Sequence, residues 1–326
     1  MPSLPSRLID AVVRPDHAVV LRLAWASLVA NIAIVVTGGA VRLTGSGLGC
    51  PSWPRCTEAS AQEPGSLVPH AELGAHGVIE FGNRMLTFVL VAVAITTLVA
   101  AWRLRPARRS LRRLALLLAL GIPAQALIGG VTVLTDLNPW IVAGHLLVSM
   151  ALISLAVVMI RRVGEGDGPA LQVLARPGVV LVRMTYVLTW IVLYLGTVVT
   201  GSGPHAGDAD APRNGLDPQA MSQLHADGVF LLVGLTIGCV AVARAVGAPA
   251  AVVRAATVLL AVELAQGTIG FVQYVTDLPE VLVATHLLGA AVLVAAATDL
   301  LLQTHQRSAG QRSSGSIAAR TNSSAR

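Results

Sequence analysis

A short segment between His76 and Arg84 places four polar side chains at helical spacing within hydrophobic sequence. The positions i, i+4, i+7 and i+8 of one helical face are occupied by His76, Glu80, Asn83 and Arg84. An imidazole, a carboxylate, an amide and a guanidinium could together move protons and bind a polar or metal-containing ligand. Ionisable groups inside a membrane helix are costly and mark a site by default. A Glu80–Arg84 pair that only neutralises itself is the alternative.

Two later histidines lie at matched depth in separate hydrophobic segments. His225 and His286 each fall about six residues inside a segment, so both lie roughly 9 Å below its outer end. A lone histidine is more often a hydrogen-bonded helix contact, but two at equal depth in one bundle can face each other, as cofactor ligands do. Bis-histidine ligation of a haem fits best, because an all-histidine zinc site would want a third ligand and usually a carboxylate.

The segments that carry these residues predict an integral membrane protein. The 326-residue chain is 54% hydrophobic and 12% charged with a mean hydropathy of +0.71, which is too apolar for a soluble fold. About 20 apolar residues suffice to cross the bilayer. We expect an all-α protein with eight spans, which cover residues 18–41, 73–102, 112–135, 140–160, 179–200, 219–243, 250–275 and 281–303.

The distribution of charge predicts the orientation of these spans. Arginines concentrate in residues 103–113, between the second and third spans, and beside the later loops that lie on the same side of the membrane. The loops on the other side are acidic. The positive-inside rule therefore places the arginine-rich gaps and both termini in the cytoplasm. The basic residues form no stripe, so the net charge of +6 does not indicate a nucleic-acid partner. Residues 1–17 are expected to be a cytoplasmic N-terminus and residues 305–326 a disordered cytoplasmic tail.

An internal repeat divides the chain into two halves. Residues 125–150 align without a gap on residues 266–291 with twelve identities in 26, and His145 matches His286. A weaker match joins VVTGG at 35–39 to VVTGS at 198–202 and places Asn83 opposite His225. We expect two tandem four-helix bundles, residues 18–162 and 179–304, pointing the same way across the membrane and joined by a cytoplasmic linker at 163–178.

The two halves are therefore expected to hold unlike sites. The second half would hold a haem fixed by two histidines. The first half, with Asn83 where a histidine is matched, would hold an incompletely ligated pocket lined by acid–base groups.

The outer loop at 42–72 contains the stretch GSGLGCPSWPRC at 45–56. Cys50 and Cys56 lie in an oxidising location and are predicted to pair, either as a structural staple or as a redox-active pair that covers the site. Cys239, alone inside the sixth span, is expected to be an inert core residue. Arg42, just outside the first span, is a candidate contact for haem propionates.

Four motifs together resemble the haem A synthase family: GGAVRLTGSGLGCPSWPRC at 38–56, IEFGNR at 79–84, TVLTDLNPWIVAGH at 132–145 and VVTGSGPHAGD at 198–208. The resemblance implies an oxidoreductase of the bacterial cytoplasmic membrane, with its haem sites toward the outer face. It would oxidise the C8 methyl of haem O to a formyl group by successive hydroxylations, with haem B as cofactor and water as the oxygen source. Implied partners are a haem O synthase upstream, an unidentified electron acceptor, membrane lipid and a second copy in a homo-oligomer.

The resemblance also implies roles for individual residues. His225 and His286 match the two haem B ligands, and His145 matches the histidine of the substrate side. Glu80 and Arg84 match a Glu-x-x-His-Arg motif on the second helix, and Cys50 and Cys56 match the paired cysteines of the first outer loop. Asn83 departs from this motif at its histidine position. Either His76, two turns outward, substitutes for that histidine or the substrate iron has one protein ligand.

Three other functions are weighed against this one. A bis-histidine b-type cytochrome that only transfers electrons is the main alternative, and it would favour two complete histidine pairs. A transporter with repeated halves would have broken helices, whereas Gly and Pro here sit mainly near the ends of spans. A haem O synthase would need aspartate-rich magnesium and diphosphate motifs, which the sequence lacks.

Overall fold

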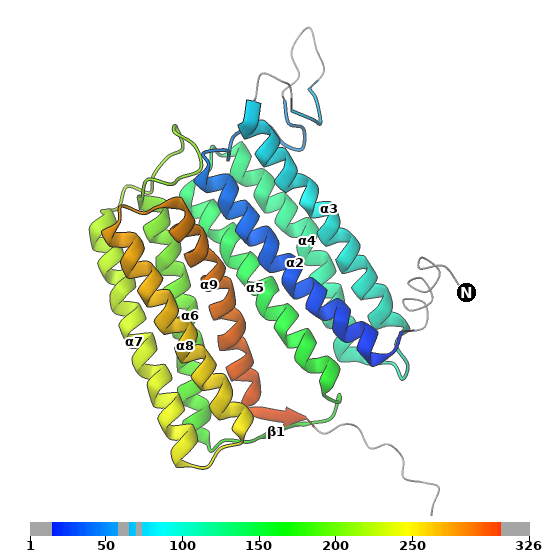
Figure 1. The fold of residues 1–326 in the computed structure, drawn as a ribbon. Coiled ribbons are helices and arrows are strands. Elements are labelled where there is room, and N and C mark those ends of the chain that lie inside the picture. The colour runs from blue at the N-terminus through cyan, green and yellow to red at the C-terminus, as the bar shows by residue number, and fades with distance from the viewer. Residues whose placement is uncertain (1–14, 58–64, 70–73, 308–326) are drawn as a thin grey trace, which may run out of the picture.

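The computed structural model describes residues 15–57, 65–69 and 74–307. Within these ranges the protein is helical apart from one two-stranded sheet (Figure 1). Eight of the described helices are long and apolar enough to cross a membrane, which confirms the predicted fold class. These helices are α2 (His17–Leu43), α3 (Gly74–Arg103), α4 (Arg109–Leu134), α5 (Pro139–Gly164), α6 (Arg176–Ser202), α7 (Pro218–Ala245), α8 (Ala250–Val275) and α9 (Glu280–Gln303).

The helices extend most of the predicted spans by a few residues, and polar residues cap several of their N-termini. The side chains of Asp16, Asn138 and Asp217 each accept a hydrogen bond from a backbone N–H in the first turn of α2, α5 and α7. Such caps satisfy donors that the helix itself leaves unpaired. Proline opens α5, α6 and α7, where its missing N–H costs no helical hydrogen bond.

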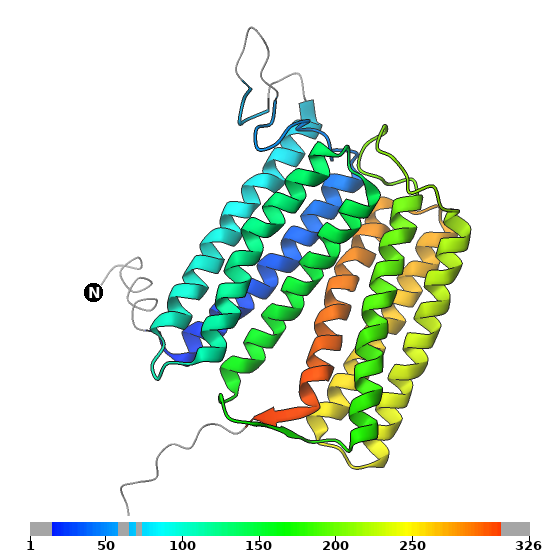
Figure 2. The same cartoon turned by 180° about the vertical axis from the view of Figure 1, so that it is seen from behind.

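The helices form two four-helix groups that lie side by side (Figures 1 and 2). Helices α2 to α5 pack in a ring, and helices α6 to α9 pack in a second ring. Within each ring a helix packs on two neighbours, so α3 lies diagonally across from α5 and α7 across from α9. The two groups meet where α9 packs on α2 and α5, and where α5 packs on α6.

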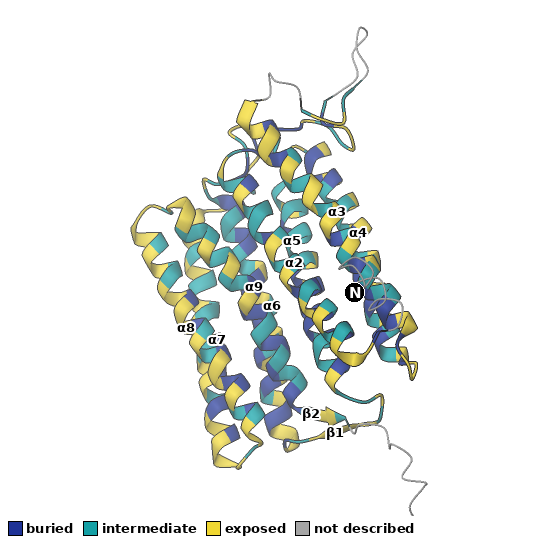
Figure 3. Cartoon of the chain, turned by 45° about the vertical axis from the view of Figure 1, so that its right-hand side comes forward, coloured by how far each residue is buried: buried dark blue, intermediate teal, exposed yellow. Residues whose placement is uncertain are grey.

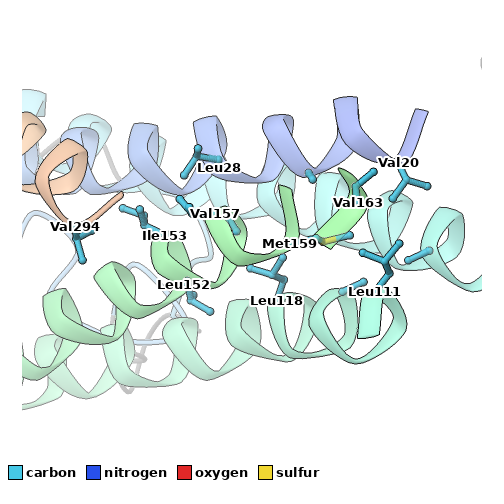
Figure 4. Packing of buried hydrophobic residues seen from close by; sticks show 14 of the residues in the cluster. Val20, Leu28, Leu111, Leu118, Leu152, Ile153, Val157, Met159, Val163 and Val294 are labelled. Carbon is cyan, nitrogen blue, oxygen red and sulfur yellow. The ribbon is translucent and has the colours of Figure 1, made fainter. Parts of the chain in front are cut away.

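The core is continuous across the junction between the two groups. Val294 of α9 belongs to the same buried cluster as Ile153 and Leu28 of the first group, and Figure 4 shows these side chains together. At the same junction Thr298 of α9 donates a hydrogen bond of 3.1 Å to Ser154 of α5. The halves are therefore packed against each other by both apolar and polar contacts.

Figure 3 shows exposed residues, in yellow, along the helices. Many of these exposed residues are large and hydrophobic. Phe230 is 74% exposed, Phe88 66% and Val281 76%. Apolar surface on this scale would promote aggregation in water. It is the surface expected of helices that are surrounded by lipid. The chain is a multi-pass membrane protein.

The loops gather at the two ends of the helices. The end that carries residues 44–57 and 203–217 is called the outer end here, and the opposite end is called the inner end (Figure 1). At the outer end the matched turns Asp136–Leu137 and Asp277–Leu278 share one unusual conformation, with φ between 51° and 59° at all four residues. Left-handed backbone is disfavoured for residues other than glycine, so both turns are held by their surroundings.

The inner end contains structure that the sequence did not predict. Strand β1 (Ala170–Gln172) pairs antiparallel with β2 (His305–Arg307), so the linker and the first residues after α9 form a small sheet. Residues 305–307 were expected to belong to a disordered tail, but their backbone groups are paired with those of the linker. Residues 308–326 and 1–14, and the predicted loop at 58–64 and 70–73, lie outside the described residues.

A polar network ties the inner loops together near the sheet. The guanidinium of Arg108 pairs with Asp167 at 3.0 Å and donates to the carbonyl of Arg162. Partial burial raises the pKa of Asp167, but hydrogen bonds from Ser110 and Arg108 outweigh it and leave this pKa below its ordinary value. The arginine-rich loop is therefore fixed to the linker that follows α5.

The predicted orientation can be tested by labelling single introduced cysteines. Asp210→Cys lies on an exposed outer loop and Arg105→Cys on an exposed inner loop. A membrane-impermeant maleimide added to intact cells should label Asp210→Cys, and it should label Arg105→Cys only after permeabilisation. The native Cys239 is buried at 3% exposure and supplies the unlabelled baseline. Labelling of Arg105→Cys in intact cells would reverse the orientation.

Candidate functional site

His225 and His286 lie near the outer end of the second group of helices. His225 is on α7 and His286 on α9, two helices that sit diagonally in the ring. His225 is seven residues and His286 six residues from the start of its helix, so both are about 9 to 10 Å below the outer end. A charge on His225 would act on His286, so the two rings lie within range of an electrostatic interaction.

Each of these imidazoles packs against a glycine of a neighbouring helix. A Cβ atom built on Gly196 of α6 would lie 3.2 Å from Cε1 of His225, and one on Gly270 of α8 would lie 3.3 Å from Cε1 of His286. Both distances are tighter than ordinary contacts, so a side chain at either glycine would push on the ring. The glycines therefore set the positions of the imidazoles.

The Nδ1 atoms of both rings are buried and have no hydrogen-bond partner among the described residues. Nδ1 of His225 lies near the main chain of Val192 but does not reach hydrogen-bonding geometry. Buried polar atoms without partners are rare in folded proteins and require an explanation. A ligand that fixes the ring orientation through Nε2 would supply one, because Nδ1 could then donate to the backbone.

His145 is the corresponding residue of the first group. It lies on α5 six residues from the start of the helix, and its ring packs on Gly129 of α4 at 3.4 Å from the Cβ position. Its Nδ1 is also buried without a partner in the described chain. Gln125 of α4 donates to the His145 carbonyl at 3.0 Å and also bonds the hydroxyl of Ser149. The ring of His145 therefore packs on the matched glycine of the preceding helix, as the ring of His286 packs on Gly270.

Asn83 lies on α3, the helix diagonal to that of His145. Its Oδ1 accepts a hydrogen bond of 2.8 Å from Oγ1 of Thr37 on α2. The amide oxygen, which is the atom that could contact a metal, is thus already engaged. The Nδ2 atom remains as a donor, and it lies 3.9 Å from the Cβ position of Gly38. The structure does not complete a histidine pair in the first group.

Glu80 and Arg84 form an ion pair that is also bound to the outer loop. Arg84 contacts Oε1 of Glu80 through Nε at 3.1 Å and through Nη2, while the backbone N–H of Cys50 donates to Oε2 of Glu80. The guanidinium also donates to the carbonyls of Cys50, Ser52 and Arg55 at 3.0 to 3.2 Å. The pair does more than neutralise itself, since it fastens the loop to α3.

The loop is closed by a disulfide between Cys50 and Cys56, as the sequence predicted. The ring of Trp53 occupies the space of a side chain at Gly130 of α4. A Cβ atom built on Gly130 would come within 2.5 Å of Cδ2 of Trp53. A Cβ at Gly49 would likewise lie 2.3 Å from the carbonyl oxygen of His76. The loop is thus packed closely over the outer ends of α3 and α4, above Glu80.

His76 is not brought into the bundle. It is exposed in the first turn of α3, and its Nδ1 is 2.9 Å from the hydroxyl of Ser46 in the loop. It lies seven residues before Asn83, so about 10 Å separates their levels along the helix. The structure therefore groups His76 with the loop and Glu80 with the interior, although all four predicted residues share one helix face.

Arg42 joins the two halves at the outer end. Its Nε donates to the His205 carbonyl at 2.5 Å and its Nη2 to the Thr200 carbonyl at 2.9 Å. The backbone N–H of Gly47 also donates to the carbonyl of Gly207 at 2.7 Å. The first outer loop therefore rests on the second. A contact of Arg42 with propionates stays a prediction.

Several residues of the site were missed by sequence reasoning. Thr37 could not be assigned to Asn83 because the two lie on different helices. Gly129 and Gly270 could have been found, since they are identical and at matched positions in the repeat that also aligns His145 with His286. Glycine inside a helix is otherwise unfavourable, so a matched pair is a signal of close contact.

Replacement of Arg84 by Gln should release the outer loop. The substitution removes the ion pair and three charge-assisted bonds to loop carbonyls, so we expect the free energy of unfolding to fall by about 2 kcal/mol. Hydrogen–deuterium exchange should rise at the amides of residues 50–56. Arg55→Gln is the matched control, because Arg55 is exposed on the same loop and its side chain makes no hydrogen bond within the described residues. Equal effects of the two variants would contradict this account.

Comparison with known proteins identifies relatives of this chain. Residues 21–213 match the family model described as "Cytochrome oxidase assembly protein". The "Heme A synthase" of Listeria monocytogenes serovar 1/2a is 32% identical over 52% of this chain and 54% of its own length. That of Lysinibacillus sphaericus is 35% identical over 42% of each chain, and that of Staphylococcus epidermidis is 25% identical over 60% of this chain and 67% of its own. The chain spans about half the length of the first of these relatives.

The family match covers more than half of the chain and includes the first outer loop, Glu80, Arg84 and His145. It ends at residue 213, before His225 and His286. The eight apolar helices and this match agree with the resemblance found in the sequence motifs. The chain belongs to the haem A synthase family of cytochrome oxidase assembly proteins.

Proposed function

We propose that this protein is a haem A synthase, which oxidises the C8 methyl of haem O to a formyl group by successive hydroxylations. The observation that carries the proposal is the pairing of two unlike polar sites at the outer ends of adjoining helix groups. One site holds His225 and His286 on diagonal helices. The other holds His145 opposite Asn83, with Glu80 and Arg84 under the disulfide loop. Membership of the family supports the same reaction.

The residues of the second group fit haem B. Two imidazoles on diagonal helices at equal depth, each seated on a glycine and each with an unpartnered Nδ1, match the requirements of axial ligands. A haem ligated on both sides has no open position and supplies one-electron transfer. His225 and His286 would bind and orient this group.

The first group would receive haem O, whose prenyl tail partitions into lipid. His145 would bind the substrate iron. Asn83 offers an amide in place of an imidazole, and one lone pair of its oxygen already accepts from Thr37. The exposed position of His76 and its contact with Ser46 argue against that residue as a second ligand. We therefore infer a substrate iron with one protein ligand.

Glu80 has the geometry of a general base. A carboxylate offers about four lone-pair sites, and the loop and Arg84 occupy three of them. The remaining site could accept a proton from the water that supplies oxygen to the substrate. Arg84 and the Cys50 N–H keep the carboxylate in place, while the disulfide loop limits access from the outer aqueous phase. The electron acceptor and the haem O synthase that supplies the substrate are proposed partners.

The decisive experiment is pigment analysis of the purified protein, produced with and without a haem O synthase. We expect haem B in both preparations and haem A only with the synthase. Glu80→Gln should keep haem B and lose at least tenfold of haem A formation, which corresponds to about 1.4 kcal/mol in the activation barrier. His286→Ala should lose the haem B. Haem B in both halves without any haem A would instead favour an electron-transferring b-type cytochrome.

The coordination of the substrate iron can be tested with Asn83→His. Haem O added to the purified protein should give a five-coordinate, high-spin spectrum that is lost in His145→Ala. In Asn83→His the added haem should become six-coordinate and low-spin, because an imidazole replaces the amide across from His145. His76→Ala is the control and should leave the spectrum unchanged. Loss of haem O binding in His76→Ala would make His76 the second ligand.

A further inference from the structure

Glu263 is a buried carboxylic acid that the proposed reaction does not use. It lies midway along α8 and is 2% exposed. Its Oε1 accepts a hydrogen bond of 2.8 Å from Oγ1 of Thr236 on α7. Its Oε2 is buried and has no partner within the described residues. An ionisable side chain left half-satisfied inside the membrane is costly and by default indicates a function.

The surroundings of Glu263 are polar on one side and contain no cation. Cys239 of α7 lies close enough to be affected by a charge on Glu263, and its thiol is 3.4 Å from the hydroxyl of Thr185 on α6. The α9 residues packed in this core are aliphatic: Leu293, Ala297 and Leu300. Tyr186 of α6 also packs against this core, and no described residue forms a salt bridge with Glu263. No charged side chain here neutralises an ionised Glu263.

The position of Glu263 relates it to the histidine pair. Glu263, Gln266 and Gly270 occupy positions i, i+3 and i+7 of α8 and share one face. Gly270 is the residue on which the ring of His286 packs, and it lies two turns, about 10 Å, from Glu263. At this distance in low dielectric, a change of charge at one site is felt at the other.

The acid belongs to the second half alone. The repeat that matches Gln125 with Gln266 and Gly129 with Gly270 places Ile122 at the position of Glu263. Ile122 is buried in the first group at 5% exposure, so an apolar side chain satisfies this position of the fold. The carboxyl group therefore accompanies the histidine pair and is not required by the shared architecture.

We propose that Glu263 is the proton-binding group coupled to the redox centre held by His225 and His286. This inference rests on the proposed function, because it needs a haem at that pair. Glu263 would take one proton from the solvent when a haem held by the pair is reduced, by the substrate porphyrin in the reaction or by a chemical reductant in a test. It releases the proton when the electron passes to the acceptor. The net charge of the second group then stays constant over the cycle.

The sign of the resulting pH dependence follows from charge balance. Reduction adds one negative charge, and protonation of Glu263 removes one, so reduction is favoured when protons are abundant. The midpoint potential of the resident haem should therefore fall as the pH rises through the titration of Glu263. Haem propionates can also titrate, so the decisive quantity is the part of the slope that depends on Glu263.

The test is a redox titration of the purified holoprotein at several pH values across neutrality. We expect the wild-type potential to fall with pH, and Glu263→Gln to flatten the dependence while retaining the haem. Thr236→Val is the matched control, since it removes the hydrogen bond but keeps the acid, and its slope should persist. An equal slope in Glu263→Gln and wild type would overturn the inference and leave the proposed function intact.

A second measurement on the wild type avoids dependence on any variant. A reduced-minus-oxidised infrared difference spectrum should show a carboxylic acid C=O band appearing on reduction, and the band should be absent in Glu263→Gln. A wild-type spectrum without such a band would overturn the inference. Wild-type protein purified without any haem would defeat the proposed function and, with it, this inference.

Discussion

The cost of placing a polar group in hydrocarbon governs where chemistry can occur in this protein. Backbone groups are satisfied within the helices, so the remaining cost falls on side chains. For Glu80 this cost is offset by hydrogen bonds from Arg84 and from the backbone of the outer loop. The cost is not offset for the imidazoles of His145, His225 and His286, since each has a buried Nδ1 without a partner in the described chain. We therefore expect ligands at these three imidazoles.

The two halves use one architecture for different chemistry. In both, a histidine six residues into the last helix packs on a glycine of the preceding helix. The halves differ where the second helix offers Asn83 or His225, and where the third helix offers Ile122 or Glu263. These few positions separate the site proposed to receive the substrate from the histidine pair proposed to hold the haem, while the helices around them stay alike.

The sequence was sufficient for the number of spans, the two groups and the disulfide, because hydrophobic length and repeats are local properties of the chain. It also indicated Glu80, Arg84 and the histidines as candidate site residues, since ionisable residues inside spans are few. It could not show that Asn83 is engaged by Thr37 or that Arg84 binds three loop carbonyls, because these contacts join separate elements. The β1–β2 pairing was missed for the same reason. Its backbone hydrogen bonds join two distant polar segments, and no pattern of side chains indicates them.

The contacts of Arg42 and Gly47 with the carbonyls of the second outer loop limit how far the halves can be treated as modules. Main-chain acceptors are insensitive to side-chain identity, but they require the two loops to keep their lengths and relative height. Insertions in one loop would therefore have to be matched in the other. A chimaera that joins halves from two relatives would inherit mismatched loops even if every helix packed correctly.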